Sequence, residues 1–306
     1  MRQLFLVLVL MTTSLVAFAQ NQSQPLQQVN KPLEINDLLE RAAVQADKYG
    51  DSFKDLFAEE RKSIEIYDKN GNLKTQRLVV SDFVLYESQV EQGNATEYRN
   101  VREVDGKAVS NRDKRATELF ERIGKAKSTS DELKRIDDEG TKYDRDFRVT
   151  GLIFFTQTLV SREARDAFKF EQAGRETING RETIILNFQQ IKSTPKITFD
   201  FDAPRKLQSS EPLARGKVWL DAETAGVWRE EHEVFVNSPL ASSPLKIIAQ
   251  KFEFARSEFE ILLPQKFTIE FFNPKENKDA KNYETTISSR LIQTYNSFKR
   301  FSVTAK

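Results

Sequence analysis

The sequence predicts an α+β fold, in which a strongly curved antiparallel sheet has its apolar concave face covered by a few helices. Apolar residues alternate with charged ones over most of the chain after residue 165, which is typical of antiparallel strands with one wet face and one apolar face. Helical spacing occurs in only a few segments. Because an apolar sheet face must be covered, a few helices suffice only if the sheet curves around them.

The first 19 residues have the features of a signal peptide. Arg2 provides a charged start, the apolar run Leu4–Leu10 follows, and Ala17-Phe18-Ala19 matches an A-x-A cleavage site. The apolar run is shorter than the ~20 residues of a membrane-spanning helix, which disfavours the alternative of an anchor. We expect cleavage after Ala19, a flexible Gln- and Asn-rich tether over residues 20–32, and a single domain over residues 33–306. The mature protein would then be exported and periplasmic, without a transmembrane span.

The composition excludes several classes of function. Lys and Arg number 47 against 46 Asp and Glu, so no excess of positive charge favours nucleic acid as a partner. The chain has no cysteine and one histidine, which leaves no thiol nucleophile and no multi-histidine metal site. The 23 phenylalanines suit an apolar interior or pocket, because their side chains need no hydrogen-bond partner. We expect no catalytic residue, no metal and no cofactor.

The front of the chain predicts a helix followed by hairpins. Apolar residues at helical spacing predict a helix over about 36–48. Phe53, Leu56 and Phe57 predict a second short helical stretch that packs against it. From Ser63 the apolar period changes to two. Asn70-Gly71, Asp105-Gly106 and, further along the chain, Asn179-Gly180 are pairs that tight hairpin turns favour, because their central positions need positive φ.

The segment at about 112–147 is highly charged and has few apolar residues. We interpret it as an insertion of one or two solvated helices over a sheet edge, broken near KSTSD, where Ser130 or Asp131 can cap the second helix. Residues 150–160 are compatible with a buried strand or a short buried helix, and we favour the helix.

The alternating strands of the second half carry the candidate site. Their inward apolar residues would line a cavity for a hydrophobic ligand, or would form a filled core of the same composition. These residues are Phe168, Phe170, Leu186, Phe188, Phe199, Phe201, Val218, Leu220, Trp228, Phe252, Phe254, Phe267, Ile269 and Phe271.

Two polar features suggest chemistry but are better explained as structure. His232 lies in REEHE with Glu230 on its own strand face. One histidine offers too little nitrogen for a catalytic zinc, and no G-x-S-x-G motif accompanies it. The carboxylates of Asp200 and Asp202 alternate with phenylalanines, as an outward strand face would.

Short motifs in the second half resemble a known family. Residues 216–236 contain Leu220-Asp221 before a turn and Gly226-Val227-Trp228-Arg229 after it, and Gly180-Arg181 forms an earlier turn. With the stretches LPQKFTIEFF and YNSFKRFSV, they resemble the LolA-like superfamily of periplasmic lipoprotein carriers, whose relatives include LppX-type lipid carriers and the N-terminal domain of RseB/MucB regulators. The resemblance covers residues 165–303 well and the front half of the chain only by pattern.

The resemblance implies an unclosed β-barrel with helices as a lid, and noncatalytic binding of acyl chains. The ligand would be a lipid or an acylated lipoprotein, and an envelope protein is a further partner to consider. Such carriers usually have one inner-strand arginine that helps to hold the lid closed, for which Arg77, Arg99 and Arg102 are the candidates. The alternative function is a structural or regulatory module with a filled core, in which residues 112–147 form the partner surface.

Overall fold

The computed structural model divides the chain into two units, residues 1–33 and 34–306. The described residues all belong to the second unit. They are 34–53, 56–88, 90–91, 95–144, 158–192, 213–238, 241–277 and 282–300. The predicted signal peptide and tether therefore lie outside the described residues, as do Asp200, Asp202, Phe199, Phe201 and most of the ambiguous segment 150–160.

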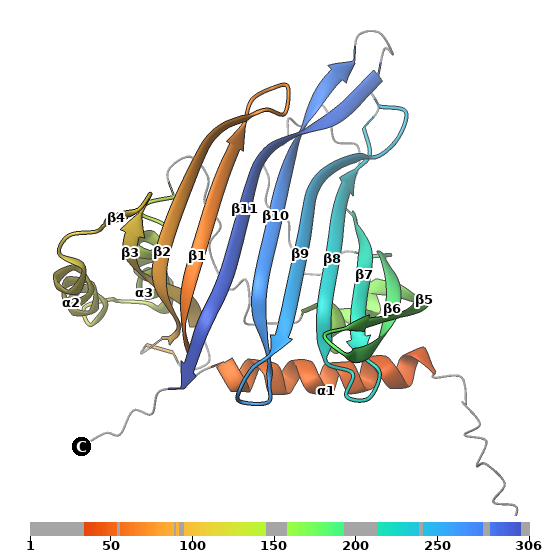
Figure 1. The fold of residues 1–306 in the computed structure, drawn as a ribbon, viewed down its shortest axis with the longest axis horizontal. Helices are drawn as coiled ribbons and strands as arrows, with labels where there is room; N and C mark the ends of the chain where they lie inside the picture. The colour runs from red at the N-terminus through yellow and green to blue at the C-terminus, as the bar shows by residue number, and fades with distance from the viewer. Residues whose placement is uncertain are drawn as a thin grey trace, which may run out of the picture. The chain divides into compact units, whose positions relative to one another are not determined.

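One antiparallel sheet of eleven strands organises the described residues, in the order β4-β3-β2-β1-β11-β10-β9-β8-β7-β6-β5 (Figure 1). The last strand, β11, pairs with both β1 and β10. The two outermost strands, β4 and β5, do not pair with each other, so the sheet is not closed. The strands are β1 Leu56–Tyr67, β2 Leu73–Glu87, β3 Ala95–Val104, β4 Lys107–Ala108, β5 Phe168–Ile178, β6 Arg181–Gln190, β7 Leu213–Asp221, β8 Val227–Val236, β9 Leu245–Arg256, β10 Leu262–Asn277 and β11 Asn282–Arg300.

The described residues also form three α-helices, α1 Ile35–Phe53, α2 Arg112–Ile123 and α3 Thr129–Gly140, and two short 3-10 turns, η1 Thr158–Val160 and η2 Arg165–Ala167. Helix α1 confirms the helix predicted over 36–48. The helical stretch predicted at 53–57 is wrong, because β1 begins at Leu56. Pairing with β2 on one side and β11 on the other overrides the weak local preference there.

The hairpin turns are confirmed, with one difference in backbone geometry. Asp105-Gly106 and Asn179-Gly180 have positive φ at both positions, as the tightest hairpin turns require. At Asn70-Gly71 only the glycine has positive φ, of 82°. There the carboxylate of Asp68 accepts hydrogen bonds from the backbone N–H groups of Asn70 and Asn72, so a side chain holds the turn.

Helices α2 and α3 confirm that the charged segment is helical and broken near KSTSD. The cap of α3 is Ser128, not Ser130 or Asp131, because Ser128 keeps extended backbone angles and its hydroxyl accepts a hydrogen bond from the N–H of Asp131. The two helices pack against β3, next to the sheet edge, and Glu132 of α3 accepts a hydrogen bond from the Tyr86 hydroxyl of β2. Their apolar residues form a small cluster with β2 and β3, made of Tyr86, Tyr98, Leu119, Ile123 and Ile136.

The main hydrophobic core lies on one face of the sheet, which we call the apolar face. Strand β8 shows the alternation that creates it: Glu230, His232, Val234 and Val236 are buried, and the residues between them are half-buried. Side chains of α1, including Leu38, belong to the same cluster as those of the strands. The period of two that the sequence shows is therefore used to bury one face.

Candidate ligand-binding face of the sheet

A row of aromatic rings crosses the apolar face from β5 to β10. The ring centroids are 5.6 Å apart for Phe168 and Phe188, 5.1 Å for Phe188 and His232, 6.0 Å for His232 and Phe252, and 4.6 Å for Phe252 and Phe267. The ring of Phe170 joins the row at 6.3 Å from that of Phe188. These separations lie in the range of favourable aromatic pairs. We call this set the aromatic row.

Strand β7 contributes no ring to the aromatic row, and a glycine explains how the row continues across it. Gly216 pairs with Phe188 on one side and His232 on the other. A Cβ atom at this position would lie 2.9 Å from Cζ of Phe188 and would collide with the backbone oxygen of Glu231. Only glycine therefore lets the Phe188 ring lie over β7 and reach His232.

The structure brings most of the sequence-predicted site residues together. Buried in the main cluster are Phe168, Leu186, Phe188, Val218, Leu220, Phe254, Phe267 and Ile269, and half-buried against it are Phe170, Phe252 and Phe271. Trp228 is buried outside that cluster, because a β-bulge displaces it from the regular alternation. Phe168 and Phe170 also line a surface pocket of about 950 Å³ together with Ile35 and Leu39 of α1.

Trp228 and the turn motifs of the family resemblance meet at one buried carboxylate. Asp221 accepts two hydrogen bonds from Arg181, each 3.0 Å, and one from the indole N–H of Trp228 at 3.1 Å. The backbone N–H groups of Glu223 and Thr224 also donate to it. Burial alone would raise the pKa of Asp221, but these donors outweigh it and hold that pKa well below its usual value. The motif residues therefore lock two hairpins together.

Sequence reasoning missed a group of charged residues on the apolar face. Glu60 and Lys62 follow the buried Ala58 on the inward side of β1. Glu60 accepts hydrogen bonds from Arg99 at 2.9 Å and from the Tyr295 hydroxyl at 2.6 Å, and Lys62 donates to Asp144 at 2.7 Å. The sequence hint was available: apolar residues resume at Ile64 on the same alternate positions, so the two charges interrupt an inward series.

Of the three candidate arginines, Arg99 is the one on the apolar face. It pairs in register with Phe83 of the main cluster, and it is 3% exposed. Burial opposes its charge, but the carboxylates of Glu60 and Glu97 outweigh burial and raise the pKa of Arg99. Arg102 instead pairs with Glu59 and Asp82 and is about one-third exposed.

The partners that the structure records for Arg99 lie on the sheet. Its guanidinium contacts Glu97 of its own strand and Glu60 of β1. Arg77, the remaining candidate, donates a hydrogen bond to the Tyr143 carbonyl, just after α3. Arg99 therefore links two strands. Of the three candidates for the predicted lid arginine, Arg77 is the one that hydrogen-bonds to the segment after α3.

The single histidine lies inside the aromatic row. His232 and Glu230 are 8% and 6% exposed, and the His232 ring nitrogen Nε2 contacts the Glu230 carboxylate. Among the described residues, no group of three or more His, Cys, Asp or Glu side chains is placed to hold a metal ion. The pair leaves one polar point in an otherwise aromatic strip.

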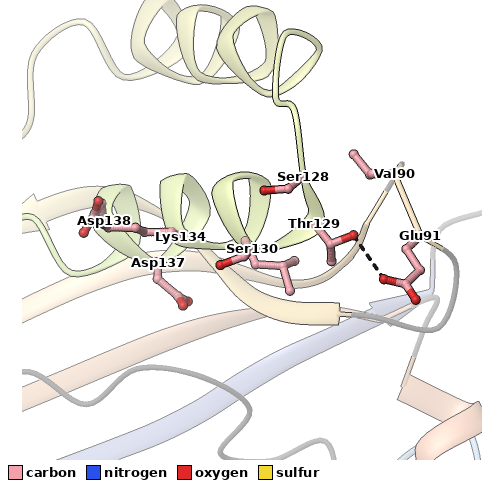
Figure 2. A pocket seen from close by; sticks show the side chains of 9 residues that line it. Val90, Glu91, Ser128, Thr129, Ser130, Lys134, Asp137 and Asp138 are labelled. Atoms are coloured by element: carbon pink, nitrogen blue, oxygen red, sulfur yellow. Dashed lines mark hydrogen bonds between the residues drawn. The ribbon is translucent and has the colours of Figure 1, made fainter.

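A second pocket lies outside the apolar face, beside the start of α3 (Figure 2). It has a volume of about 1080 Å³, and its lining includes Val90, Glu91, Leu133 and Asp138. The Thr129 hydroxyl closes one side by donating to Glu91 at 3.3 Å. None of the predicted site residues lines this pocket.

Together, the fold and the site define a class of protein: an α+β protein with an open antiparallel sheet and an aromatic, mainly apolar face. No protein-family model matches the chain, and no curated protein matches it. None of the helices that the structure describes combines the length and the apolarity needed to cross a membrane.

A comparison with solved structures finds similar chains, at low sequence identity and low TM-score. A LolA superfamily protein from Nitrosomonas europaea is 9% identical, with 87% of this chain and 94% of that chain covered and a TM-score of 0.34. The lipoprotein LppX from Mycobacterium tuberculosis is 7% identical, with 89% of this chain and 100% of that chain covered and a TM-score of 0.26. A chain of the MucA/MucB complex from Pseudomonas aeruginosa is 8% identical, with 86% of this chain and 99% of that chain covered and a TM-score of 0.22.

Proposed function

We propose that this protein is an exported, noncatalytic binder or carrier of a hydrophobic ligand in the cell envelope, and that the ligand is a lipid or the acyl chains of a lipoprotein. The observation that carries the proposal is the aromatic row, which places five phenylalanine rings and one imidazole side by side across the apolar face. Such a strip offers an acyl chain continuous apolar contact and few polar groups to desolvate.

Apolar contact alone can supply the affinity of such a carrier. Each methylene group removed from water contributes about 0.8 kcal/mol, so a tail that buries about ten of them gains ~8 kcal/mol, the scale of micromolar binding. No reactive group is needed for this function. It therefore fits a chain with one histidine and no cysteine.

Helix α1 acts as the lid in this proposal. Its apolar side chains belong to the core, and the ion pairs that hold it in place are exposed and therefore weak. Arg162 binds Glu40 and Asp47, each at 2.7 Å, through side chains that are roughly half exposed. Exposed ion pairs of this kind contribute at most about 1 kcal/mol each. The rings are buried, with Phe267 only 1% exposed. One end of the aromatic row lies beside α1, where Phe168 and Phe170 line a pocket with Ile35 and Leu39, so a ligand would gain access there when α1 moves.

The proposed location follows from the N-terminal sequence. The charged start, the apolar run and the A-x-A site predict export with cleavage after Ala19. Mass spectrometry of the protein recovered from the periplasm tests this directly, and we expect a mature chain that begins at Gln20. A chain that retains Met1 and stays with the membrane fraction would contradict export.

The experiment that tests the function is native mass spectrometry of protein purified from its exported compartment, followed by extraction of bound lipid. We expect a reproducible extra mass that disappears on extraction, together with binding of a hydrophobic dye. The matched variant is Phe252→Ser, which removes one half-buried ring of the aromatic row, and the control is Phe120→Ser on α2. Ligand-free protein that also ignores the dye would rule the function out.

A second candidate is a partner-binding module with a filled core. Two observations favour it: Phe188 and Phe267 are 3% and 1% exposed, and Phe120 of α2 is 41% exposed near the pocket-bearing helix α3. Charge reversal over residues 112–147 should then abolish partner pull-down and leave lipid uptake unchanged. Loss of lipid uptake with the partner still bound would favour the carrier instead.

A further inference from the structure

A groove of about 460 Å³ lies between α1 and two turns of the sheet. One wall is the C-terminal half of α1, and the others are the β7–β8 and β9–β10 turns. The volume falls within the usual range of small-molecule sites. The groove is lined by Gln45, Lys48, Tyr49, Ser52, Thr224, Gly226, Val227, Arg256, Glu260, Ile261 and Leu262.

The floor of the groove is continuous with the hydrophobic core. Tyr49 and Val227 line the groove and belong to the main cluster, where they are 7% and 0% exposed. Ile261 and Leu262 line it too and pack against the same cluster. Inside, the ring of Tyr49 meets the ring of Phe254 edge to face, at a centroid separation of 6.0 Å. The apolar floor of the groove and the apolar face therefore belong to one cluster, so a tail that displaces these floor residues meets apolar side chains next.

The rim of the groove has an excess of positive charge. Lys48 and Arg256 line it against one carboxylate, that of Glu260. Glu260 accepts a hydrogen bond from Arg256 at 2.7 Å, and among the described residues no carboxylate forms an ion pair with Lys48. Gln45, Lys48, Tyr49 and Ser52 share one side of α1 because they are three or four residues apart, so the apolar and cationic groups face the same opening.

We propose that this groove is the mouth of the carrier and selects a lipid whose headgroup carries a net negative charge. The proposal rests on the proposed function. The tail lies over Tyr49 toward Phe254, and the headgroup stays at the rim beside Lys48 and Arg256. Charge complementarity at the rim, where the cations outnumber the carboxylates by one, commits the site to an anionic amphiphile, because a zwitterionic headgroup gains little from a net positive charge.

The test compares two tail-labelled fluorescent lipids with the same acyl chains, phosphatidylglycerol and phosphatidylcholine. We expect the native protein to bind phosphatidylglycerol about tenfold more tightly at low salt. The double variant Lys48→Gln, Arg256→Gln should lose that preference while phosphatidylcholine binding stays unchanged. The matched control is Lys107→Gln, Lys217→Gln, which removes the same charge from exposed positions on β4 and β7 and should keep the preference.

A cysteine placed at the rim gives a second readout, because the chain contains no other thiol. Ser52→Cys, labelled with an environment-sensitive dye, should change its emission when phosphatidylglycerol is added. The same dye on Thr117→Cys of α2 should not respond. A response at Thr117 and none at Ser52 would place the mouth elsewhere and overturn the inference.

The outcomes separate this inference from the function on which it rests. If the native protein binds both lipids equally, or if the rim variant keeps the preference, the groove is not the anionic mouth, although the carrier function stands. If neither lipid binds but the protein still binds the hydrophobic dye, the anionic mouth is overturned and the carrier function stands; if the dye is also ignored, both are overturned. Circular dichroism should give each variant the same thermal unfolding midpoint as the native protein, which shows that a change in lipid binding is not caused by misfolding.

Discussion

Asp221 shows how much of this fold depends on one carboxylate. It lies at the end of β7 and is 1% exposed. Its carboxylate accepts hydrogen bonds from the guanidinium of Arg181, in the neighbouring hairpin, and from the indole N–H of Trp228. A buried carboxylate with this many donors is stabilised as the anion. The turn residues that resemble the LolA-like family therefore have a structural explanation, which holds whatever ligand the protein binds.

We expect Asp221→Asn to destabilise the protein by about 2–4 kcal/mol at pH 7, because it removes the buried carboxylate that Arg181, Trp228 and two backbone N–H groups donate to and leaves Arg181 with only the exposed Glu223. The folded pKa lies below the usual value of 3.8, so the contribution of the carboxylate is complete above that value and is lost as the pH falls toward the folded pKa. Urea unfolding at pH 7 and pH 3 measures this. The difference between native protein and variant should shrink at pH 3.

The control for this prediction is Glu223→Gln. Glu223 also binds Arg181, at 2.8 Å, but its side chain is 77% exposed. An exposed pair contributes little, so we expect a change below about 0.5 kcal/mol. Equal losses for the two variants, or an Asp221→Asn effect that does not depend on pH, would refute the explanation.

Gly216 is the other position where a single residue decides local packing. We expect Gly216→Ala to cost more than about 2 kcal/mol, because the added methyl group overlaps the Phe188 ring and a backbone oxygen. Gly124→Ala, at the end of α2, is the matched control, since its Cβ would have no contact closer than 3.6 Å. Chemical unfolding measures both, and a similar small effect for the two would mean that the glycine in β7 is dispensable.

At the scale of elements, β1 combines two kinds of inward position. Leu56, Ala58 and Ile64 join the main cluster, whereas Glu60 and Lys62 bring charges into the same face. Both charges are paired, and Lys62 holds Asp144 of the segment after α3. Burial raises the pKa of Asp144 even though Lys62 opposes the shift, so the pair depends on close contact between the two elements.

A double-mutant cycle tests that pair. We expect Lys62→Met and Asp144→Asn each to destabilise the protein by about 3 kcal/mol, because each leaves a buried group without its partner. The double variant should lose clearly less than the sum of the two, by at least about 1 kcal/mol. Strictly additive losses in thermal or urea unfolding would show that the two elements are not coupled through these side chains.

At the scale of the molecule, the last strand joins the two halves of the sheet. Strand β11 lies between β10 and β1, and β1 is the first strand of the described sheet in sequence order. Thr294 pairs with Arg61 on one side and with Lys266 on the other. The chain therefore completes its sheet only when its C-terminal part has been made, through contacts far apart in sequence, which makes folding slow.

We expect Thr294→Pro to abolish folding or to cost more than about 3 kcal/mol, because proline removes a ladder hydrogen bond in a strand that is paired on both sides. Thr294→Ala, which keeps the backbone N–H, should cost less than about 1 kcal/mol. Circular dichroism and unfolding curves measure both. A folded Thr294→Pro protein with near-native stability would contradict the central position of β11.

The sequence determined those features that depend on neighbouring residues. The helix beginning near Ile35 follows from apolar spacing, the turns at Asp105-Gly106 and Asn179-Gly180 from residues that tolerate positive φ, and the inward Phe positions from the period of two. These are local properties, because backbone hydrogen bonds in helices and turns close within a few residues. The family resemblance likewise came from short motifs.

Only the tertiary structure decided which distant segments meet. Nothing near Glu60 shows that Arg99 and Tyr295 will donate hydrogen bonds to it, and nothing near Gly216 shows that the Phe188 ring will lie over it. The placement of β11 beside β1 is of the same kind. Such contacts depend on strand order and register, which are set by burying one face of the whole sheet rather than by local preference.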